Sequence, residues 1–277
     1  MALNNFIPSI WSETLYQALD NTYVAVRNCN RAFEGEIRGK GDAVTICGIG
    51  PVSVFDYTKN TDMNAPETLT DMSRTLTISQ AKAFNFQIDD VDRAQQFPKV
   101  MNEAMRVAAS ALSAAADEHV FSLYRNALEE NVITETGVTY ENMLDLLIAA
   151  RKKLIAAGVT SQDVVLEVSP DVAALILKAK ILTADAGDEA LESGYIGNFV
   201  GFRVYVSNNV ATKEESEGLF HKCFARTRRA IAFAEQLSEI DAYRPEKRFA
   251  DAVKGLHLYG AKVVYANELV VLNLNLA

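Results

Sequence analysis

The side chains that could carry out chemistry in this sequence are its histidines, cysteines and clustered charges. His221 and His257 lie in predicted strands with no paired acid or cysteine nearby in the sequence. His119 follows Asp117 and Glu118 on the apolar face of a predicted helix, where a buried or interface histidine is expected. Because no segment combines a nucleophile, a base and a group that orients the base, we predict no catalytic residue.

Three short patterns resemble binding motifs, but each lacks part of the motif. The segment Gly48-Ile-Gly50-Pro51 lacks the third glycine of a dinucleotide loop, and a strand rather than a helix follows it. The acids between residues 185 and 192 do not have the spacing of a calcium-binding loop. The glycines at 194 and 197 match the RNA-clamping GxxG pattern, but a strand follows here too. We therefore predict no cofactor and no metal site.

The charge and cysteine content excludes several classes of protein. A net charge of −9, from 36 acidic and 27 basic residues, argues against a dedicated nucleic-acid binder. We expect the basic cluster ARTRRA to form ion pairs within or between subunits, since an acidic run precedes it. Three widely spaced cysteines favour free thiols and synthesis in a reducing cytoplasm. No secretory signal and no apolar run of membrane-spanning length is visible.

The first predicted element is a short amphipathic helix on an N-terminal arm. Residues 7–19 place apolar side chains on one helical face, among them Ile7, Ile10, Trp11 and Leu15. We expect this face to be exposed on the free subunit and to contact another molecule, because an exposed apolar patch usually marks an interaction site.

A long polar stretch follows, between two strand-like segments. Residues 56–71 are almost free of apolar side chains, which is uncommon inside a compact domain. We interpret residues 52–80 as a two-stranded extension with a mobile tip.

A long helix is predicted from Pro98 to about Glu130, because the segment contains no glycine and no internal proline. At 1.5 Å per residue such a helix would be about 50 Å long and would cross the whole molecule. That length favours a flat or elongated subunit.

The remaining segments indicate an α+β fold. A helix ends at Gly158, DVVLEVS forms a buried strand, and Ser169-Pro170-Asp171 starts another helix. Residues 194–209 predict a glycine loop followed by a strand, and the chain from Gly218 onward is rich in strand patterns.

The order of these elements resembles that of the tailed-phage major capsid proteins, with the Hong Kong ninety-seven type of shell fold. The family's N-terminal arm resembles FIPSIWSETLYQAL, and its lead into the first strand resembles FEGEIRGKGDAVTI. The entry to its spine helix is similar to AFNFQIDDVDRAQ. Its axial domain resembles LLIAARKKLIAAGV, DVVLEVSPDVAALIL and GYIGNFVGFRVYVSNNV in turn, and the return into its peripheral domain resembles AVKGLHLYGAKVV.

The resemblance implies a domain organisation. The expected segments are an N-terminal arm (1–38), a strand lead-in and extended hairpin loop (39–97, with its tip at about 56–71), a peripheral-domain spine helix (98–136), an axial domain (137–236), and return strands of the peripheral domain (237–277).

The resemblance also implies a function, which is self-assembly into an icosahedral shell that encloses a double-stranded DNA phage genome without sequence-specific binding. Pentamers and hexamers of the chain would form the shell, with a separate scaffold protein and a portal as partners. Such a protein is found in the virion and is made in the host cytoplasm. The expected assembly contacts come from the arm and the hairpin, namely Ile7, Ile10, Trp11, Leu15, Tyr57, Lys59, Met63 and Glu67.

Three other functions remain open from the sequence. The first is an encapsulin-like nanocompartment shell, which resembles the same fold but encloses enzymes. The second is an enzyme whose site is assembled from residues far apart in the sequence. The third is a nucleic-acid-binding module built on ARTRRA and RKK, which the net charge of −9 disfavours.

Overall fold

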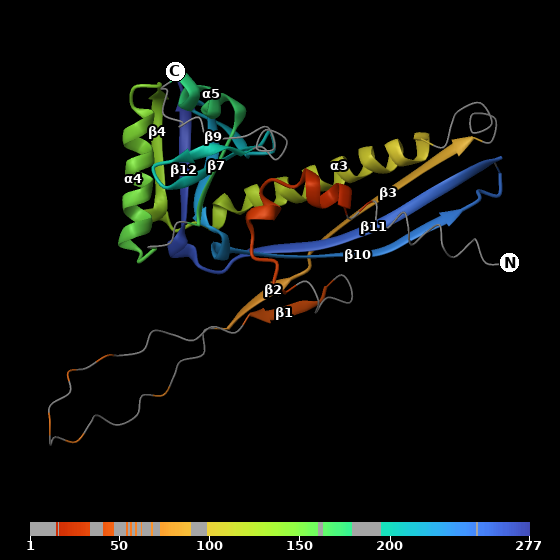
Figure 1. The fold of residues 1–277 in the computed structure, drawn as a ribbon, viewed down its shortest axis with the longest axis horizontal. Coiled ribbons are helices and arrows are strands. Elements are labelled where there is room, and N and C mark those ends of the chain that lie inside the picture. The colour runs from red at the N-terminus through yellow and green to blue at the C-terminus, as the bar shows by residue number, and fades with distance from the viewer. Residues whose placement is uncertain are drawn as a thin grey trace.

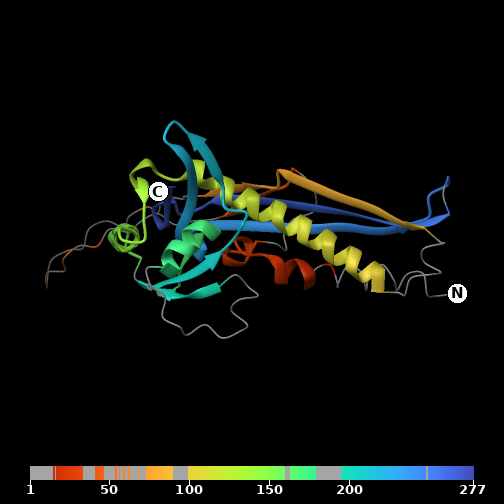
Figure 2. The ribbon, with the colours of Figure 1, turned by 90° about the horizontal axis from the view of Figure 1, so that it is seen from above.

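The computed structural model describes residues 15, 17–33, 41–46, 54, 56, 59, 62, 68, 73–89, 99–159, 163–178, 195–247 and 249–277. These residues form an α+β fold with two main parts, one compact and one long and narrow (Figure 1). The long part extends away from the compact part in both views, so the subunit is elongated (Figure 2). The α+β class and the elongated shape both agree with the sequence predictions.

The compact part is a seven-stranded mixed sheet with two helices. Its spatial order is β4 (Val132–Val138), β12 (Leu269–Leu276), β9 (Gly218–Thr227), β5 (Val164–Val168), β7 (Phe202–Val206) and β6 (Tyr195–Phe199), with β8 (Thr212–Glu215) paired to β9. Its helices are α4 (Met143–Ala156) and α5 (Pro170–Lys178). All five residues of β5 are buried, as expected of a strand in the middle of a sheet with both faces covered.

Helix α4 ends and helix α5 begins where the sequence predicts. Helix α4 buries one face, and at its end Gly158 takes a φ of +84°, which glycine adopts without strain. Helix α5 begins with Pro170, and the Ser169 hydroxyl accepts a hydrogen bond from the Val172 N–H at 3.4 Å. Gly158 thus ends α4, and Ser169 caps the N-terminus of α5, in the ways common to protein helices.

The long part is an antiparallel sheet of three long strands, crossed by one helix. The strands, in spatial order, are β10 (Ile231–Tyr243), β11 (Ala250–Val263) and β3 (Gln80–Asp89), and the helix is α3 (Lys99–Ser122). An apolar stripe on α3 is fully or almost fully buried, including Met105, Ala109, Leu112, Ala116 and Val120. Helix α3 thereby covers this part of the sheet.

Helix α3 is shorter than the sequence indicates. It is uninterrupted from Lys99 but ends at Ser122 instead of near Glu130, so its length is about 36 Å. The chain then forms two single turns of 3-10 helix, η3 (Leu123–Asn126) and η4 (Glu129–Asn131), before β4. Strand β4 pairs in parallel with β12, so the chain has to turn here to reach the sheet edge, and this tertiary pairing outweighs local helix propensity.

The strands β1 (Ala43–Ile46) and β2 (Arg74–Thr77) form an antiparallel pair beside the long part. Val44 and Leu76 belong to a second buried cluster that includes Leu258 of β11. A Cβ at Gly260 would lie 2.3 Å from the Thr77 carbonyl oxygen, so a side chain there would push β2 away. Between β1 and β2 most residues, including most of the predicted tip at 56–71, lie outside the described residues.

The segment 194–209 forms a hairpin of two strands, where the sequence predicted a glycine loop and one strand. Strands β6 and β7 pair with Phe199 opposite Phe202, so the turn consists of Val200 and Gly201. Both have positive φ, +48° and +76°, which is typical of a two-residue hairpin turn whose twist matches that of the strands. The glycine is therefore required by the turn.

The chain passes between the two parts at short 3-10 turns. From β9 it passes through η5 (Arg228–Ala230) into β10, and from β11 through η6 (Ala266–Glu268) back into β12. The domain boundary expected at 236/237 thus falls inside β10. The C-terminal strand β12, expected among the return strands of the long part, lies in the compact sheet between β4 and β9.

Candidate functional site: a buried polar junction and an exposed helix face

Most of the assembly contacts expected from the sequence lie outside the described residues. These are Ile7, Ile10, Trp11, Tyr57, Met63 and Glu67. Lys59 is described and is exposed in a turn. Leu15 is the last of the expected contacts, and the structure places it in a different environment from the one predicted.

Leu15 is buried in its own subunit, so the prediction of an exposed contact at this position is wrong. Leu15, Leu19 and Tyr23 are each at most 1% exposed and belong to the same apolar cluster as Met105 of α3. The apolar periodicity of the arm does indicate a helix, and residues 17–22 are helical. Periodicity shows which face is buried, but it does not show whether the same chain or a neighbour covers that face.

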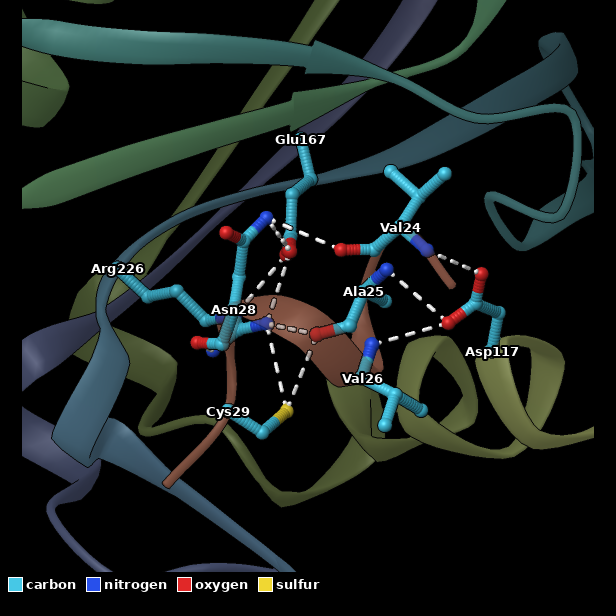
Figure 3. Close-up of polar contacts among 8 residues, drawn as sticks. All are labelled: Val24, Ala25, Val26, Asn28, Cys29, Asp117, Glu167 and Arg226. Atoms are coloured by element: carbon cyan, nitrogen blue, oxygen red, sulfur yellow. Dashed lines mark hydrogen bonds and ion pairs between the residues drawn. The ribbon is translucent and has the colours of Figure 1, made fainter. Parts of the chain in front are cut away.

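After this helix, residues 24–29 are held against α3 by hydrogen bonds to one carboxylate. Asp117 accepts hydrogen bonds from the backbone N–H groups of Val24, Ala25 and Val26 at 2.9, 3.0 and 2.9 Å (Figure 3). These N–H groups lie just before or at the start of the 3-10 turn η1 (Val26–Asn28). Asp117 of α3 therefore caps the N-terminal end of this turn. Burial raises the pKa of Asp117 to about 6, and the three hydrogen bonds act in the opposite direction.

The other side of this segment meets a buried ion pair from the compact sheet. Arg226 of β9 donates two hydrogen bonds to Glu167 of β5, with Nη2–Oε1 at 2.8 Å and Nε–Oε2 at 2.9 Å, and both side chains are fully buried. Arg226 also donates to the carbonyl oxygens of Asn28 at 2.7 Å and Ala25 at 3.0 Å. The Asn28 side-chain amide donates to Glu167 at 3.1 Å (Figure 3). Together these contacts satisfy a pair of charges that would be costly to bury alone.

The N-terminal segment also contacts the long sheet. Glu235 of β10 accepts hydrogen bonds from the Tyr23 hydroxyl at 2.5 Å and from Arg31 at 2.7 Å, and it lies 2.8 Å from His257 Nε2. Asn30 exchanges backbone hydrogen bonds with Ile231 and Phe233, both at 2.9 Å. Residues 23–31 thus connect α3, the compact sheet and the long sheet. We call this set of contacts the polar junction.

The basic cluster ARTRRA forms ion pairs inside the subunit, one of the two outcomes expected from the sequence. Arg226 pairs with Glu167, and Arg229 donates to both oxygens of Glu268 at 2.5 and 2.8 Å. The partners are not the acids just before the cluster, since Glu215 pairs with Lys222. The sequence could not indicate that Glu167 and Glu268 are the partners, because both lie far from the cluster in the sequence.

His119 is half-buried against Tyr259, with ring centroids 5.6 Å apart.

Helix α4 exposes large apolar side chains on a face that lies beside its buried one. Leu144, Ile148 and Ile155 are 39%, 47% and 55% exposed, and they recur at helical spacing. The helix lies at the outer edge of the compact part (Figure 1). We call these three residues the α4 face. This surface could not be recognised from the sequence, because its residues border the buried stripe of α4 and extend the same apolar pattern.

Within the described residues, no three histidine, cysteine or acidic side chains gather in a way that could hold a metal ion. In the same part of the chain, no helix is long and apolar enough to cross a membrane.

The chain matches the model of a family described as phage capsid protein over residues 72–271, and it therefore belongs to that family. Its fold is similar to that of "Mycobacterium phage Che8", at 29% identity over 90% of each chain and a TM-score of 0.66. The "Capsid of Ralstonia phage GP4" shares the fold at 10% identity and a TM-score of 0.68, over 90% of this chain and 86% of that chain. No curated protein matches the sequence.

A virus-like particle from Pyrococcus furiosus also shares the fold, at 12% identity and a TM-score of 0.59, over 96% of this chain and 99% of that chain. Such a low identity shows the fold alone. The family match and the structural matches to phage capsids make the chain a major capsid protein of the tailed-phage type, whose copies assemble into the shell of the virion. The encapsulin-like alternative is less favoured.

Proposed function

We propose that this chain forms an icosahedral shell around a double-stranded DNA genome, and that the α4 face is one of the contacts between subunits. The compact part corresponds in this proposal to the axial domain, and the long part to the peripheral domain. Copies meet around local five-fold and six-fold axes through heterologous contacts, and closure of the shell ends growth.

The observation that carries this proposal is the exposure of Leu144, Ile148 and Ile155 on one face of α4. A row of large apolar side chains at the edge of a subunit is unfavourable in water and becomes favourable when a neighbour covers it. The chain belongs to a family whose members assemble with copies of themselves, so the covering surface is a second copy of this chain.

Further contacts come from the arm and the hairpin. Ile7, Ile10 and Trp11 extend the arm beyond the buried Leu15, and we propose that they reach a neighbouring subunit. Tyr57, Lys59, Met63 and Glu67 would contact another neighbour from the hairpin. Contacts spread over several partners let each remain weak while the closed shell is stable.

The remaining partners are part of the same proposal, and family membership supports them. A separate scaffold protein and a portal assist assembly in the host cytoplasm, and the DNA is packed inside without sequence-specific binding. The acidic net charge of −9 requires that cations neutralise much of the enclosed DNA. In this role the chain has no catalytic turnover.

The test of the α4 contact is Ile148→Glu, which places a charge in the middle of the α4 face. Because Ile148 is exposed, the subunit should keep its thermal unfolding midpoint while shell formation is lost. Leu219→Glu, at a residue that is 49% exposed near the start of β9, is the matched control and should still assemble. Normal shells from Ile148→Glu, seen by electron microscopy, contradict the proposal.

A further inference from the structure

The described chain passes between the compact part and the long part three times, and each passage is made of short 3-10 turns. Helix α3 leads to β4 through η3 and η4, β9 leads to β10 through η5, and β11 leads to β12 through η6. These turns lie where the two parts meet (Figure 1). Hinges consist of a few residues at the ends of elements, so the two parts can rotate against each other only at these turns.

One carboxylate holds the passage through η5. Glu268 of η6 accepts hydrogen bonds from Arg229 Nε at 2.8 Å, from Arg229 Nη2 at 2.5 Å and from the Thr227 hydroxyl at 2.5 Å. Thr227 is the last residue of β9, and Arg229 lies in the turn that leads into β10. Glu268 therefore binds the end of the compact part and the start of the long part together. We call Thr227, Arg229 and Glu268 the Glu268 clamp.

Other hydrogen bonds tie the three passages to one another around η6. The Ala230 carbonyl oxygen of η5 accepts hydrogen bonds from the backbone N–H groups of Val264 at 2.8 Å and Tyr265 at 3.2 Å. The Asn131 side-chain amide, at the end of η4, donates to the Ala266 carbonyl oxygen of η6 at 3.2 Å. All three passages are thus bonded to η6 or to the two residues before it.

The clamp combines a buried acid with an exposed base. The Glu268 side chain is 8% exposed and that of Arg229 is 63% exposed, with Arg229 Cζ 5.3 Å from the centre of the Tyr265 ring. Charge-assisted bonds of this paired geometry are stronger and more directional than those between neutral groups. Neutralising Glu268 should therefore weaken the hold on η5 without removing any apolar side chain from the core.

We propose that Glu268 is the positioning residue that fixes the angle between the two parts, and with it the curvature of the shell. At about 3.3 Å per residue, the 14 residues of β11 extend roughly 46 Å from this joint. A rotation of about 5° at the joint would move the far end by about 4 Å, which is the full separation of two packed carbon atoms. Copies packed around local axes would then close at a different radius.

The curvature rests on the proposed function, whereas the angle is a property of a single subunit. The polar junction also connects the two parts, but it does so through residues 23–31 and not at the passages. The clamp joins β9 directly to the turn before β10. Glu268→Gln opens the clamp and leaves every contact of the polar junction in place, so the two connections can be tested separately.

The test is the distance between the two parts in the free full-length subunit, measured by pulsed electron paramagnetic resonance. Spin labels are attached through Ser110→Cys on α3 and Lys152→Cys on α4, both at exposed positions. Cys29 and Cys223 are buried and should not react, and Cys47 is replaced by serine. Without a further substitution we expect one narrow distance peak. Glu268→Gln and Arg229→Gln should each shift or broaden it.

Arg228→Gln is the matched control, because Arg228 is exposed in the same turn while Arg229 makes the contact with Glu268. This variant should keep the narrow peak. A narrow, unshifted peak in Glu268→Gln overturns the proposal, and it does so even if the unfolding midpoint falls, because a purely structural role lowers stability without changing the angle.

Shell diameters measured by electron microscopy test the second half of the proposal. Wild type and Arg228→Gln should form shells of one diameter, and Glu268→Gln should form shells of several diameters or shells that do not close. Altered distances with an unaltered shell diameter overturn the link to curvature. A wild-type chain that forms no shell contradicts the proposed function and the curvature with it, while the distances still decide whether Glu268 sets the angle.

Discussion

Arg226 and Glu167 form a bidentate ion pair in which neither side chain is exposed to solvent. The pair joins β9 to β5 and also binds the N-terminal segment through the carbonyl oxygens of Ala25 and Asn28. The junction therefore links the start of the chain to the middle of the compact sheet. Its stability should depend on both charges being present together.

Removing one charge from this pair should be costly. We expect Glu167→Ala to lower the free energy of unfolding by about 3–5 kcal/mol, because it leaves Arg226 buried without its carboxylate. The double variant Glu167→Leu/Arg226→Met should lose less than the single variant, since no charge remains buried. Urea unfolding of the free subunit measures both. A single variant as stable as the wild type would show that the pair is not closed in solution.

Asp117 should make stability depend on pH. Burial raises its pKa in the folded state to about 6, against an ordinary value of 3.8, so the folded chain binds this proton more tightly than the unfolded chain. The stability from this group is fully present below about pH 4 and is lost as the pH rises through about 6, a change of about 2–3 kcal/mol.

Asp117→Asn isolates this effect from the other carboxylates. We expect the difference in unfolding free energy between wild type and variant to shrink from about pH 4 to about pH 6 and then stay constant. Chemical unfolding at several pH values measures that difference. A difference that grows over this interval would mean that the three backbone hydrogen bonds, which lower the pKa, outweigh burial.

The arm should divide into a folding part and an assembly part near Leu15. Deleting residues 1–11 removes Ile7, Ile10 and Trp11 but keeps Leu15, so the subunit should fold and assemble poorly. Deleting residues 1–20 also removes the buried Leu15 and Leu19, so the subunit should be destabilised by at least the 2–5 kcal/mol typical of one buried leucine. Thermal unfolding and light scattering separate the two effects. Equal stability of the two truncations contradicts the buried position of Leu15.

The hairpin gives a prediction about amide exchange. Residues 74–77 are already paired with β1 in the single subunit, so their protection should be high before assembly. Residues 56–71 have few apolar groups to anchor them, and their protection should rise only in shells, where neighbours cover them. Exchange measured on free subunits and on particles compares the two states. Equal protection of 56–71 in both would remove the hairpin from the assembly contacts.

Much of the fold could be predicted from sequence because its signals are local. The stop at Gly158, the cap at Ser169 and the uniformly apolar β5 each follow from residues within a few positions of one another. The end of α3 at Ser122 could not be predicted, because it is set by the pairing of β4 with β12.

The site depends on distant contacts and was largely missed. Asp117 and Val24 are 93 positions apart, and Arg226 and Glu167 are 59 apart, so no spacing rule connects them. The same holds for Leu15, whose burial depends on the rest of its own core. The family could still be recognised from the sequence, because the resemblance depends on the order of the helices and strands. That order does not require any of the long-range contacts to be known.

Electron microscopy of the purified full-length chain, alone and together with the scaffold protein proposed above, tests the central claim most directly. The account predicts closed icosahedral shells, and light scattering of the same samples should show particles far larger than a dimer. Monomers or dimers alone, under both conditions and with the subunit folded, would contradict the assignment of this chain as a shell-forming protein.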